Sequence, residues 1–382
     1  MSSADPTAAA LPGLDAHPHA RAVLGSALPP QGHPSHAYLF HGPSGTGKRT
    51  VARAFAAALL SDGSADRGTV ARRVERGSHP DLTWVTPSGA AEMLVSDVDE
   101  PVIAAATRTP FESSRRVFVI EGADTMNDQA ANRMLKTLEE PAPFVHLLLL
   151  ADRPDDLLAT VASRCQAVRF DPLPSELIAA RVRAEGVSSQ RALACARLAL
   201  GDARLARELA GEHGQALRAA GEHLVRGALQ GKAAERPWMA LLEAARAAGE
   251  RLGRDLSARD GADLELLPAS DRRRHEREAT ERLRRGERRA RTRALDLALG
   301  LGGLWLRDLA CVADGASELV HAVDRRDALD ADVDAAGRSS AELRAGLVLV
   351  EETRRRLALN VSEELALEAL GYRLEELLAG GD

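Results

Sequence analysis

The sequence is poor in several residue types, and each shortage excludes a class of protein. Its only cysteines, Cys165, Cys195 and Cys311, are too few and too scattered for a disulfide framework or a four-cysteine zinc site. Aromatic residues make up 3% of the chain, so Leu, Ala and Val must fill its cores, which favours packed helices. No apolar run approaches the roughly 18 residues that a membrane span needs, and the first residues lack the pattern of a signal peptide. These absences predict a helix-rich protein of the reducing cytoplasm, without membrane contact.

Lysine is also scarce, because Lys48, Lys136 and Lys232 are the only lysines among 50 basic residues. A site that keeps Lys in so Arg-rich a chain has reason to need the smaller ammonium group. The net charge of −6 argues against a protein that coats nucleic acid through overall positive charge. The strongest basic concentration, residues 272–293, holds eleven Arg and four Glu. It has no interleaved aromatic residues on which bases could stack, so a solvated helix face is favoured there over a DNA-binding surface.

Short apolar runs alternate with helical patterns in the first part of the chain. Strands that alternate with helices predict a parallel sheet covered by helices on both faces. A helix is predicted after the third run, with Asn127 as its N-cap and an end before Pro141. The predicted strands are residues 38–40, 82–85, 117–120, 146–150 and 167–170.

Strand signals vanish after Pro172, and the rest of the chain predicts helices. A short helical set runs to about residue 211, and a longer set follows to the C-terminus. We therefore expect domain boundaries near 172 and 212. Residues 1–15, rich in Ala, Ser and Pro, predict a flexible tail before the α/β domain of residues 16–172.

A phosphate-binding P-loop is the clearest motif. The segment Gly42-Pro-Ser-Gly-Thr-Gly-Lys48 follows a predicted strand and opens a predicted helix, which is the context that a P-loop needs. Its glycines let backbone N–H groups turn toward phosphate oxygens, and Lys48 reaches the outer phosphates of ATP or ADP. The predicted nucleotide-binding residues are Gly42, Gly45, Thr46, Gly47, Lys48, Arg49 and Thr50.

The residues around the P-loop predict poor hydrolysis. Arg49 stands where a Ser or Thr hydroxyl would hold Mg²⁺, and Thr50 points about 100° further round the helix. After strand 117–120 come Glu121 and Gly122, where an ATPase has an acid for the metal and often a base for water. Gly122 has no side chain to act as that base. Alternatives left open are a local irregularity that restores the metal ligand and a base supplied from elsewhere in the chain.

These motifs together resemble the clamp-loader AAA+ family of bacterial DNA polymerase III. Residues 36–48 resemble the family's first strand and P-loop, and Asn132 to Pro141 its clamp-loader helix. Ser163-Arg-Cys165 resembles the family's SRC motif, and residues 360–370 resemble its last helix. The resemblance is strongest from about residue 20 to 172, and the Glu121-Gly122 pair is typical of a non-hydrolysing member.

The resemblance implies an AAA+ domain over residues 16–172, a helical lid over 173–211 and an all-α collar for oligomerisation over 212–382. It implies a subunit without catalysis of its own in a DNA-directed DNA polymerase holoenzyme. That subunit would help to load the beta sliding clamp onto primed DNA, in a hetero-pentamer with gamma/tau and delta subunits. Arg164 would be an arginine finger for a neighbouring subunit's ATP, although an Arg at a strand entry is more often a salt-bridge residue. Arg204 would occupy the second sensor position of the lid.

One departure from the family concerns zinc. Members usually carry a four-cysteine zinc module before a His-Pro-Asp segment, here His79-Pro-Asp81, but residues 61–78 contain no cysteine. We therefore expect neither zinc nor any other resident metal. Lys136, on the clamp-loader helix, faces DNA, a neighbouring subunit or solvent beside Glu140. Two rival functions stay open: an active gamma/tau-like ATPase, and a DNA-binding protein acting through residues 272–293.

Overall fold

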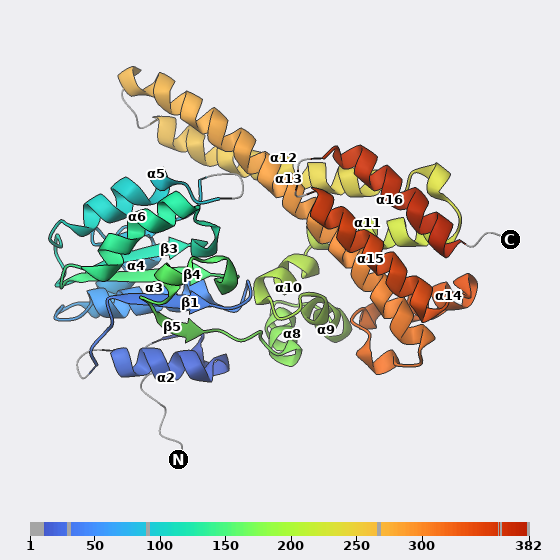
Figure 1. Cartoon of the computed structure of the whole chain (residues 1–382), viewed down its shortest axis with the longest axis horizontal. Coiled ribbons are helices and arrows are strands. Elements are labelled where there is room, and N and C mark those ends of the chain that lie inside the picture. Colours follow the sequence, from blue (N-terminus) through green and yellow to red (C-terminus); the bar gives the residue numbers. More distant parts are fainter. Residues whose placement is uncertain are drawn as a thin grey trace, which may run out of the picture. The chain divides into compact units, whose positions relative to one another are not determined.

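The computed structural model describes two compact units (Figure 1), residues 1–174 with 201–203, and residues 175–200 with 204–382. Within them, placement is described for residues 11–28, 32–88, 92–265, 269–357, 359 and 361–379, and side chains 259–278 and 282 lie outside the description. Among the described residues, no helix has an apolar stretch long enough to cross a bilayer.

The first unit contains a five-stranded parallel sheet in the order β2-β3-β4-β1-β5. All five predicted strands are confirmed. The central strand β4 is buried along its whole length, which explains why its sequence is apolar apart from His146. The strands are β1 (Ala37–His41), β2 (Leu82–Val85), β3 (Arg116–Glu121), β4 (Val145–Ala151) and β5 (Gln166–Arg169).

Helices cover both faces of this sheet, and alternate residues of β4 face opposite cores. Leu147 and Leu149 pack in the core that contains Met134, whereas Leu148 and Leu150 pack in the core that contains Phe55. The α/β fold that the sequence predicts is therefore confirmed, with the P-loop directly after β1. The helices of this unit are α2 (Pro18–Ala27), α3 (Lys48–Leu60), α4 (Arg67–Glu75), α5 (Val95–Val98), α6 (Asp128–Glu139) and α7 (Ala159–Ala162).

Helix α6 begins and ends where the sequence predicts. The side chain of Asn127 accepts a hydrogen bond from the backbone N–H of Ala130 at 2.9 Å, which satisfies a donor in the first turn. The helix ends at Glu139, two residues before Pro141. This end places Lys136 and Glu139 on the last turn.

Two segments of the first unit add structure that the sequence did not indicate. Leu11 and Leu14 are fully buried, so chain packing begins inside the segment predicted to be a flexible tail, whereas residues 1–10 lie outside the described residues. The cysteine-free segment 61–78 forms α4, whose N-cap Asp66 accepts from the N–H of Thr69 at 2.9 Å. Among the described residues, no group of three or more His, Cys, Asp and Glu side chains could hold a metal ion.

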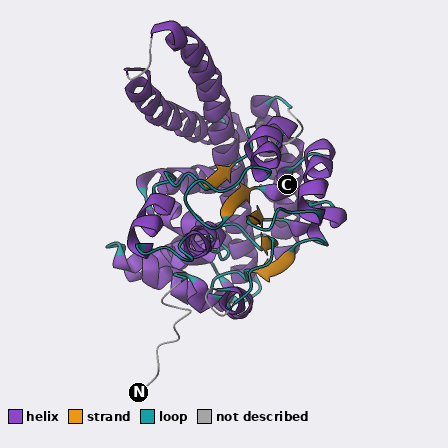
Figure 2. Cartoon of the chain, turned by 90° about the vertical axis from the view of Figure 1, so that its left-hand side faces the viewer, coloured by secondary structure: helices purple, strands orange, loops and turns teal. Residues whose placement is uncertain are grey.

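The second unit is built of helices around one hydrophobic core, and Figure 2 shows how helices dominate the chain outside the sheet. Cys195 and Leu209, from the predicted lid, share this core with Leu217, Trp238 and Trp305 from the predicted collar. Lid and collar therefore lie in one compact unit, and their division at residue 212 stays a prediction. The helices are α8 (Ser175–Ala184), α9 (Ser189–Leu198), α10 (Ala203–Ala210), α11 (Glu212–Leu229), α12 (Met239–Glu265), α13 (Ala269–Ala313), α14 (Arg326–Ala336), α15 (Ser340–Leu357) and α16 (Glu363–Leu378).

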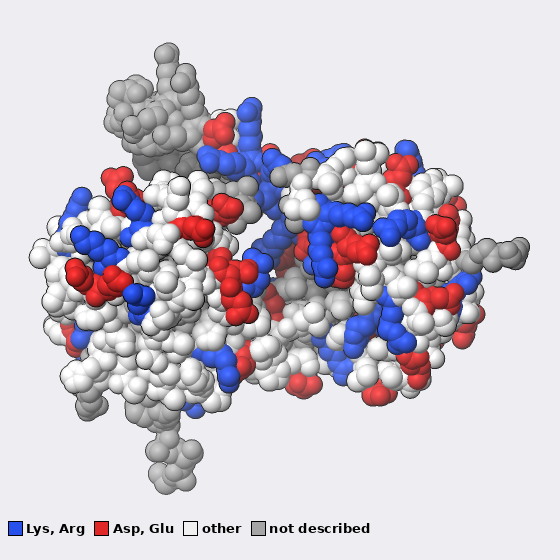
Figure 3. All heavy atoms as spheres, viewed as in Figure 1, with Lys and Arg blue, Asp and Glu red and all other residues white. Residues whose placement is uncertain are grey.

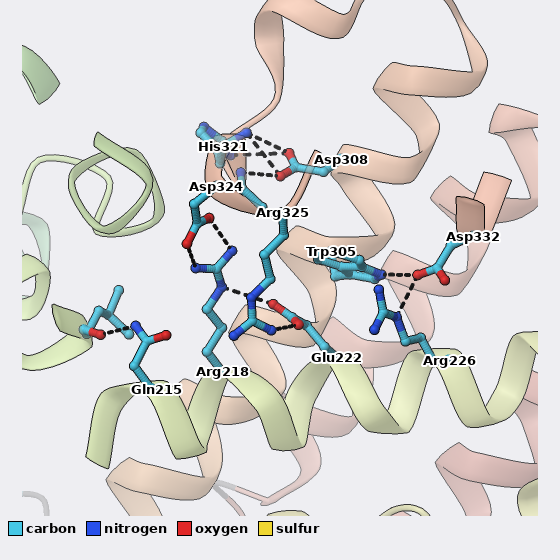
Figure 4. A network of polar contacts seen from close by, with 12 residues as sticks. Gln215, Arg218, Glu222, Arg226, Trp305, Asp308, His321, Asp324, Arg325 and Asp332 are labelled. Carbon is cyan, nitrogen blue, oxygen red and sulfur yellow. Dashed lines mark hydrogen bonds and ion pairs between the residues drawn. The ribbon is translucent and has the colours of Figure 1, made fainter. Parts of the chain in front are cut away.

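A buried ionic network ties α11 to the segment that precedes α14 (Figure 4). Arg218, 1% exposed, donates to both carboxylate oxygens of Asp324 at 2.8 and 2.9 Å and to Glu222 at 2.9 Å. Glu222 also accepts from Arg325. Because each buried charge has a partner of opposite sign, the network fixes the path of this segment against α11.

Candidate functional site: the P-loop and its surroundings

The P-loop connects β1 to α3, and its glycines adopt backbone conformations that other residues rarely reach. Gly42 has φ +137°, and a Cβ there would lie 1.9 Å from the carbonyl oxygen of Phe170. Gly45 has φ +68°. Thr46 is buried, and its hydroxyl donates to the Pro43 carbonyl at 2.9 Å. The loop between β1 and α3 thus follows a backbone path that requires glycine at residues 42 and 45.

Lys48 has its ammonium group fully engaged within the protein. The group donates to the carbonyl oxygens of Gly42 and Pro43, the latter at 2.7 Å, and lies 2.7 Å from a carboxylate oxygen of Asp152. The side chain is 7% exposed. An ammonium group has three N–H donors, so these three acceptors match its whole donor capacity.

Asp152 follows β4 and is held in place by Asp124, which follows β3. The two oxygens of Asp124 accept from the backbone N–H groups of Asp152 at 3.3 Å and Arg153 at 3.1 Å. Asp124 is 8% exposed. No sequence pattern indicated the pairing of Asp152 with Lys48 or the role of Asp124.

Arg49 and Glu121 form an ion pair beside the P-loop. One oxygen of Glu121 accepts from Arg49 Nε at 3.1 Å and from Trp84 Nε1 at 3.0 Å. The Arg49 guanidinium also lies 5.8 Å from the centre of the Trp84 ring. The carboxylate that would hold a metal therefore has a side-chain cation as its neighbour. Next to it, Gly122 has φ +72° and supplies no side chain.

Thr50 lies away from this cluster. It lines a cavity of about 650 Å³ beside α3 and α4, together with Ala54 and Ala57. None of the P-loop residues 42–49 lines that cavity. The hydroxyl of Thr50 therefore does not take the place of the metal ligand that is missing at Arg49, as the helical periodicity predicts.

Residues 201–203 return to the first unit and contact the P-loop. The N–H of Ala203 donates to the carbonyl of Gly45 at 3.3 Å. A Cβ built on Gly45 would lie 1.7 Å from a carboxylate oxygen of Asp202. The Asp202 carboxylate thus packs directly on the Gly45 backbone, a contact between residues 157 positions apart that no sequence signal indicated.

Arg164 and the P-loop lie at opposite ends of two adjacent parallel strands, β5 and β1. It precedes β5, whose first residue, Gln166, pairs with Tyr38 in β1, whereas the P-loop follows the last residue of β1. The Arg164 guanidinium donates to the carbonyl of Thr160 at 2.8 Å and lies 2.5 Å from a carboxylate oxygen of Glu139. Its side chain is 36% exposed. This separation prevents Arg164 from reaching a phosphate held by its own P-loop.

Arg204 and Lys136, two further predicted residues, are both exposed to solvent. Arg204 is exposed in the first turn of α10, in the second unit. Lys136 is exposed on α6, and its neighbour Arg133 pairs with Asp99 at 2.6 Å. Much of the basic stretch 272–293 lies outside the described side chains.

Where side chains are described, the end of this stretch does not form a surface of positive charge alone. Arg291 and Arg293, from the end of the stretch, form ion pairs with Glu363 and Glu208. On the face shown in Figure 3, described basic side chains are interspersed with acidic ones in each unit.

Comparison with known proteins finds similarity over the first unit. A family model described as "DNA polymerase III, delta subunit" matches residues 17–174. DNA polymerase III subunit delta′ of Bacillus subtilis is 37% identical over 164 residues, which are 41% of this chain and 49% of that protein. Over these residues the chain is similar to DNA polymerase III delta prime subunits. The chain spans about half the length of this curated relative, and the residues that the family model matches contain the P-loop, α6 and Arg164.

The chain is also similar to other subunits of DNA polymerase III. Subunit tau of Bacillus subtilis is 30% identical to this chain over 156 residues, which are 39% of this chain and 27% of that protein. A solved gamma subunit-related protein from Thermotoga maritima aligns over 93% of this chain and 97% of its own, with 15% identity and a TM-score of 0.45.

Proposed function

We propose that the chain is a largely non-hydrolysing delta prime subunit of a DNA polymerase III clamp loader. In this role it assembles with gamma/tau and delta subunits, and the complex places the beta sliding clamp on primed DNA. Its own contribution to ATP chemistry is Arg164, acting on nucleotide bound by a neighbouring subunit. The observation that carries the proposal is that Arg164 and the P-loop lie at opposite ends of the adjacent parallel strands β5 and β1.

The lack of hydrolysis follows from the residues around the P-loop. A metal-assisted phosphoryl transfer needs a hydroxyl and an acid on Mg²⁺, and a residue that orients water. Here Arg49 replaces the hydroxyl and pairs with Glu121 at 3.1 Å, while Gly122 offers no base. A divalent cation would have to displace the Arg49 guanidinium, so these contacts disfavour an active gamma/tau-like ATPase.

The role of Arg164 is supported by how its guanidinium is held. Contacts with Glu139 and the carbonyl of Thr160 restrain the side chain, yet it keeps 36% exposure. A restrained, exposed guanidinium can stabilise charge on a transferring phosphoryl group without first being ordered. Because its own P-loop is out of reach, that phosphoryl group must belong to a neighbour.

The experiment is reconstitution of the complex with Arg164→Ala, with Arg169→Ala as the matched control. Arg169 lies in the same strand region, is 59% exposed and pairs with Asp171, so its loss tests the removal of a surface arginine. We expect Arg164→Ala to assemble normally but to lower ATP turnover at the neighbouring site by roughly a thousandfold. Clamp loading should fail with it and persist with Arg169→Ala.

Two results would contradict the proposal. Normal ATPase activity and clamp loading in an assembled Arg164→Ala complex would refute the role of this residue in trans. Steady-state ATP hydrolysis by the isolated chain would refute the non-hydrolysing role and favour the active ATPase. Salt-sensitive binding of the isolated chain to duplex DNA would instead support the rival function, a DNA-binding protein that acts through residues 272–293.

A further inference from the structure

Phe111 differs from the other phenylalanines of the chain because its ring lies in solvent. It is 84% exposed, whereas the other five lie in, or pack against, the buried cores of the first unit. Aromatic residues make up only 3% of the sequence, and this one fills no core. An exposed phenyl ring keeps a large apolar surface in water, so a partner that covers it gains free energy. Phe111 is therefore a candidate contact for another molecule.

The loop that carries Phe111 is held in place by buried and ionic contacts. The fully buried carboxylate of Asp81 accepts from the backbone N–H groups of residues 111–113 at 2.5, 2.9 and 2.9 Å. The next side chain along, Glu112, lies 2.6 Å from the guanidinium of Arg73. Because the backbone under the ring is already fixed, a partner that buries Phe111 pays little entropy to order the loop.

Phe111 and Arg164 lie at the same end of the parallel strands. Their loops lead into β3 and β5, and both strands run in the same direction through β4 and β1. The strand order β3-β4-β1-β5 puts three strand spacings between the two loops (Figure 1). At about 4.8 Å each, these spacings amount to roughly 14 Å. A standard protein–protein interface covers about 800 Å² of each partner, which is wide enough to include both residues.

The surroundings of Phe111 favour a protein partner over nucleic acid. Single-stranded nucleic acid binds to successive aromatic platforms beside a positive groove. Phe111 is a single ring, and the carboxylate of Glu112 beside it is 36% exposed. One aromatic ring on a fixed loop is instead typical of an anchor that fills an apolar pocket at a protein interface.

Arg108 adds a charge that a protein partner can match. It lies three residues before Phe111 and is exposed. Within the described residues, its guanidinium has no acidic partner. A carboxylate at the edge of the partner's pocket would therefore complement this side of the loop.

We propose that Phe111 is a hydrophobic anchor for the neighbouring gamma/tau subunit, the same subunit whose nucleotide Arg164 reaches. The ring enters an apolar pocket of that subunit, and Arg108 pairs with a carboxylate at the edge of the pocket. The inference rests on the proposed function, because the role of Arg164 defines which end of the sheet faces the neighbour. Arg164 acts on ATP turnover and Phe111 on the strength of assembly, so different measurements test them.

The test is the dissociation constant of the full-length chain for the purified gamma/tau subunit of the same organism, measured by biolayer interferometry. The variants are Phe111→Ala and Phe111→Leu. Thr109→Ala is the matched control, because Thr109 is an exposed residue of the same loop. Urea unfolding checks that each variant keeps the native stability, as expected where the replaced side chain fills no core.

We expect Phe111→Ala to weaken binding to gamma/tau by roughly thirtyfold, the loss typical of an aromatic anchor. Phe111→Leu should recover most of the affinity, and Thr109→Ala should stay within about twofold of the native chain. At saturating concentrations, ATP turnover in the assembled Phe111→Ala complex should equal that of the native complex, unlike turnover with Arg164→Ala.

Three results would overturn the inference while leaving the proposed function intact. They are native affinity of Phe111→Ala for gamma/tau, an equal loss of affinity in Thr109→Ala, and a loss of primed-DNA binding by the Phe111→Ala complex with unchanged affinity for gamma/tau. Failure of the native chain itself to bind gamma/tau would instead refute the proposed function, and the inference with it.

Discussion

Replacing His146 by Gln should remove a pH dependence from the stability of the first unit. His146 lies in the buried strand β4, is 3% exposed, and has its Nδ1 atom 2.9 Å from the carbonyl oxygen of Ser35. Its ring stacks on His36 with the ring centres 5.8 Å apart. Burial lowers the pKa of His146 to about 4, because the imidazolium loses its water, and the positive charges of Arg115 and His36 act in the same direction.

The sign and size of the effect follow from this pKa. In the unfolded chain the imidazole has its ordinary pKa of 6.5, so below that pH the unfolded state takes up a proton that the folded state refuses. The stability that neutral His146 preserves is present above pH 6.5 and is lost as pH falls toward 4. One pKa unit corresponds to about 1.4 kcal/mol, which gives a loss of about 2 kcal/mol at pH 5 and about 3 kcal/mol at pH 4.

The assay is urea unfolding at several pH values, followed by the fluorescence of Trp84. Trp238 and Trp305, both in the second unit, are replaced by Phe in the native and variant chains alike, so that the signal reports the first unit. Gln keeps a donor for the Ser35 carbonyl and does not titrate. The difference in unfolding free energy between the chains should change by about 2 kcal/mol between pH 7.5 and 5. A difference that stays constant with pH would refute the reasoning.

Three further substitutions test other parts of the fold. Asp81→Ala removes a fully buried carboxylate that accepts from the backbone N–H groups at residues 111, 112 and 113. The variant should lose about 3 kcal/mol of unfolding free energy, measured in urea, and its amide hydrogens in that loop should exchange faster. Unchanged amide exchange would contradict this expectation. Arg218→Ala leaves the Asp324 carboxylate without the arginine that donates to both its oxygens and removes one of the two arginines that contact Glu222, so the second unit should lose about 3 kcal/mol. A variant that unfolds at the same temperature as the native chain would count against a stabilising network. Asn127→Ala removes the N-cap of α6 and should lower the free energy of unfolding in urea by about 1 kcal/mol. An unchanged free energy of unfolding would contradict a stabilising role of this cap.

The sheet and its main helix could be predicted because local patterns determine them. Unbroken apolar runs of four or five residues predict strands buried on both faces, and β4 has that environment. Asn127 before an apolar period, and Pro141 after it, mark the limits of α6 from chemistry within a few residues. The cradle of Gly42 to Lys48 was predictable for the same reason, since its motif is contiguous.

The side-chain contacts around the P-loop could not be predicted from such local patterns. Glu121 meets Trp84 because β2 pairs with β3, and that register appears only once the sheet is formed. Asp202 reaches Gly45 across most of the first unit's sequence. Side-chain pairing of this kind depends on tertiary geometry, in which many polar residues compete for each partner, so the residue types alone leave it undetermined.

The most direct test of the clamp-loader assignment is to isolate the chain at its native level from its own cells and identify the proteins that co-purify with it. The account predicts gamma/tau and delta subunits of DNA polymerase III in a stable complex that survives gel filtration. Recovery of the chain without these subunits, or in a complex with unrelated proteins, would contradict it.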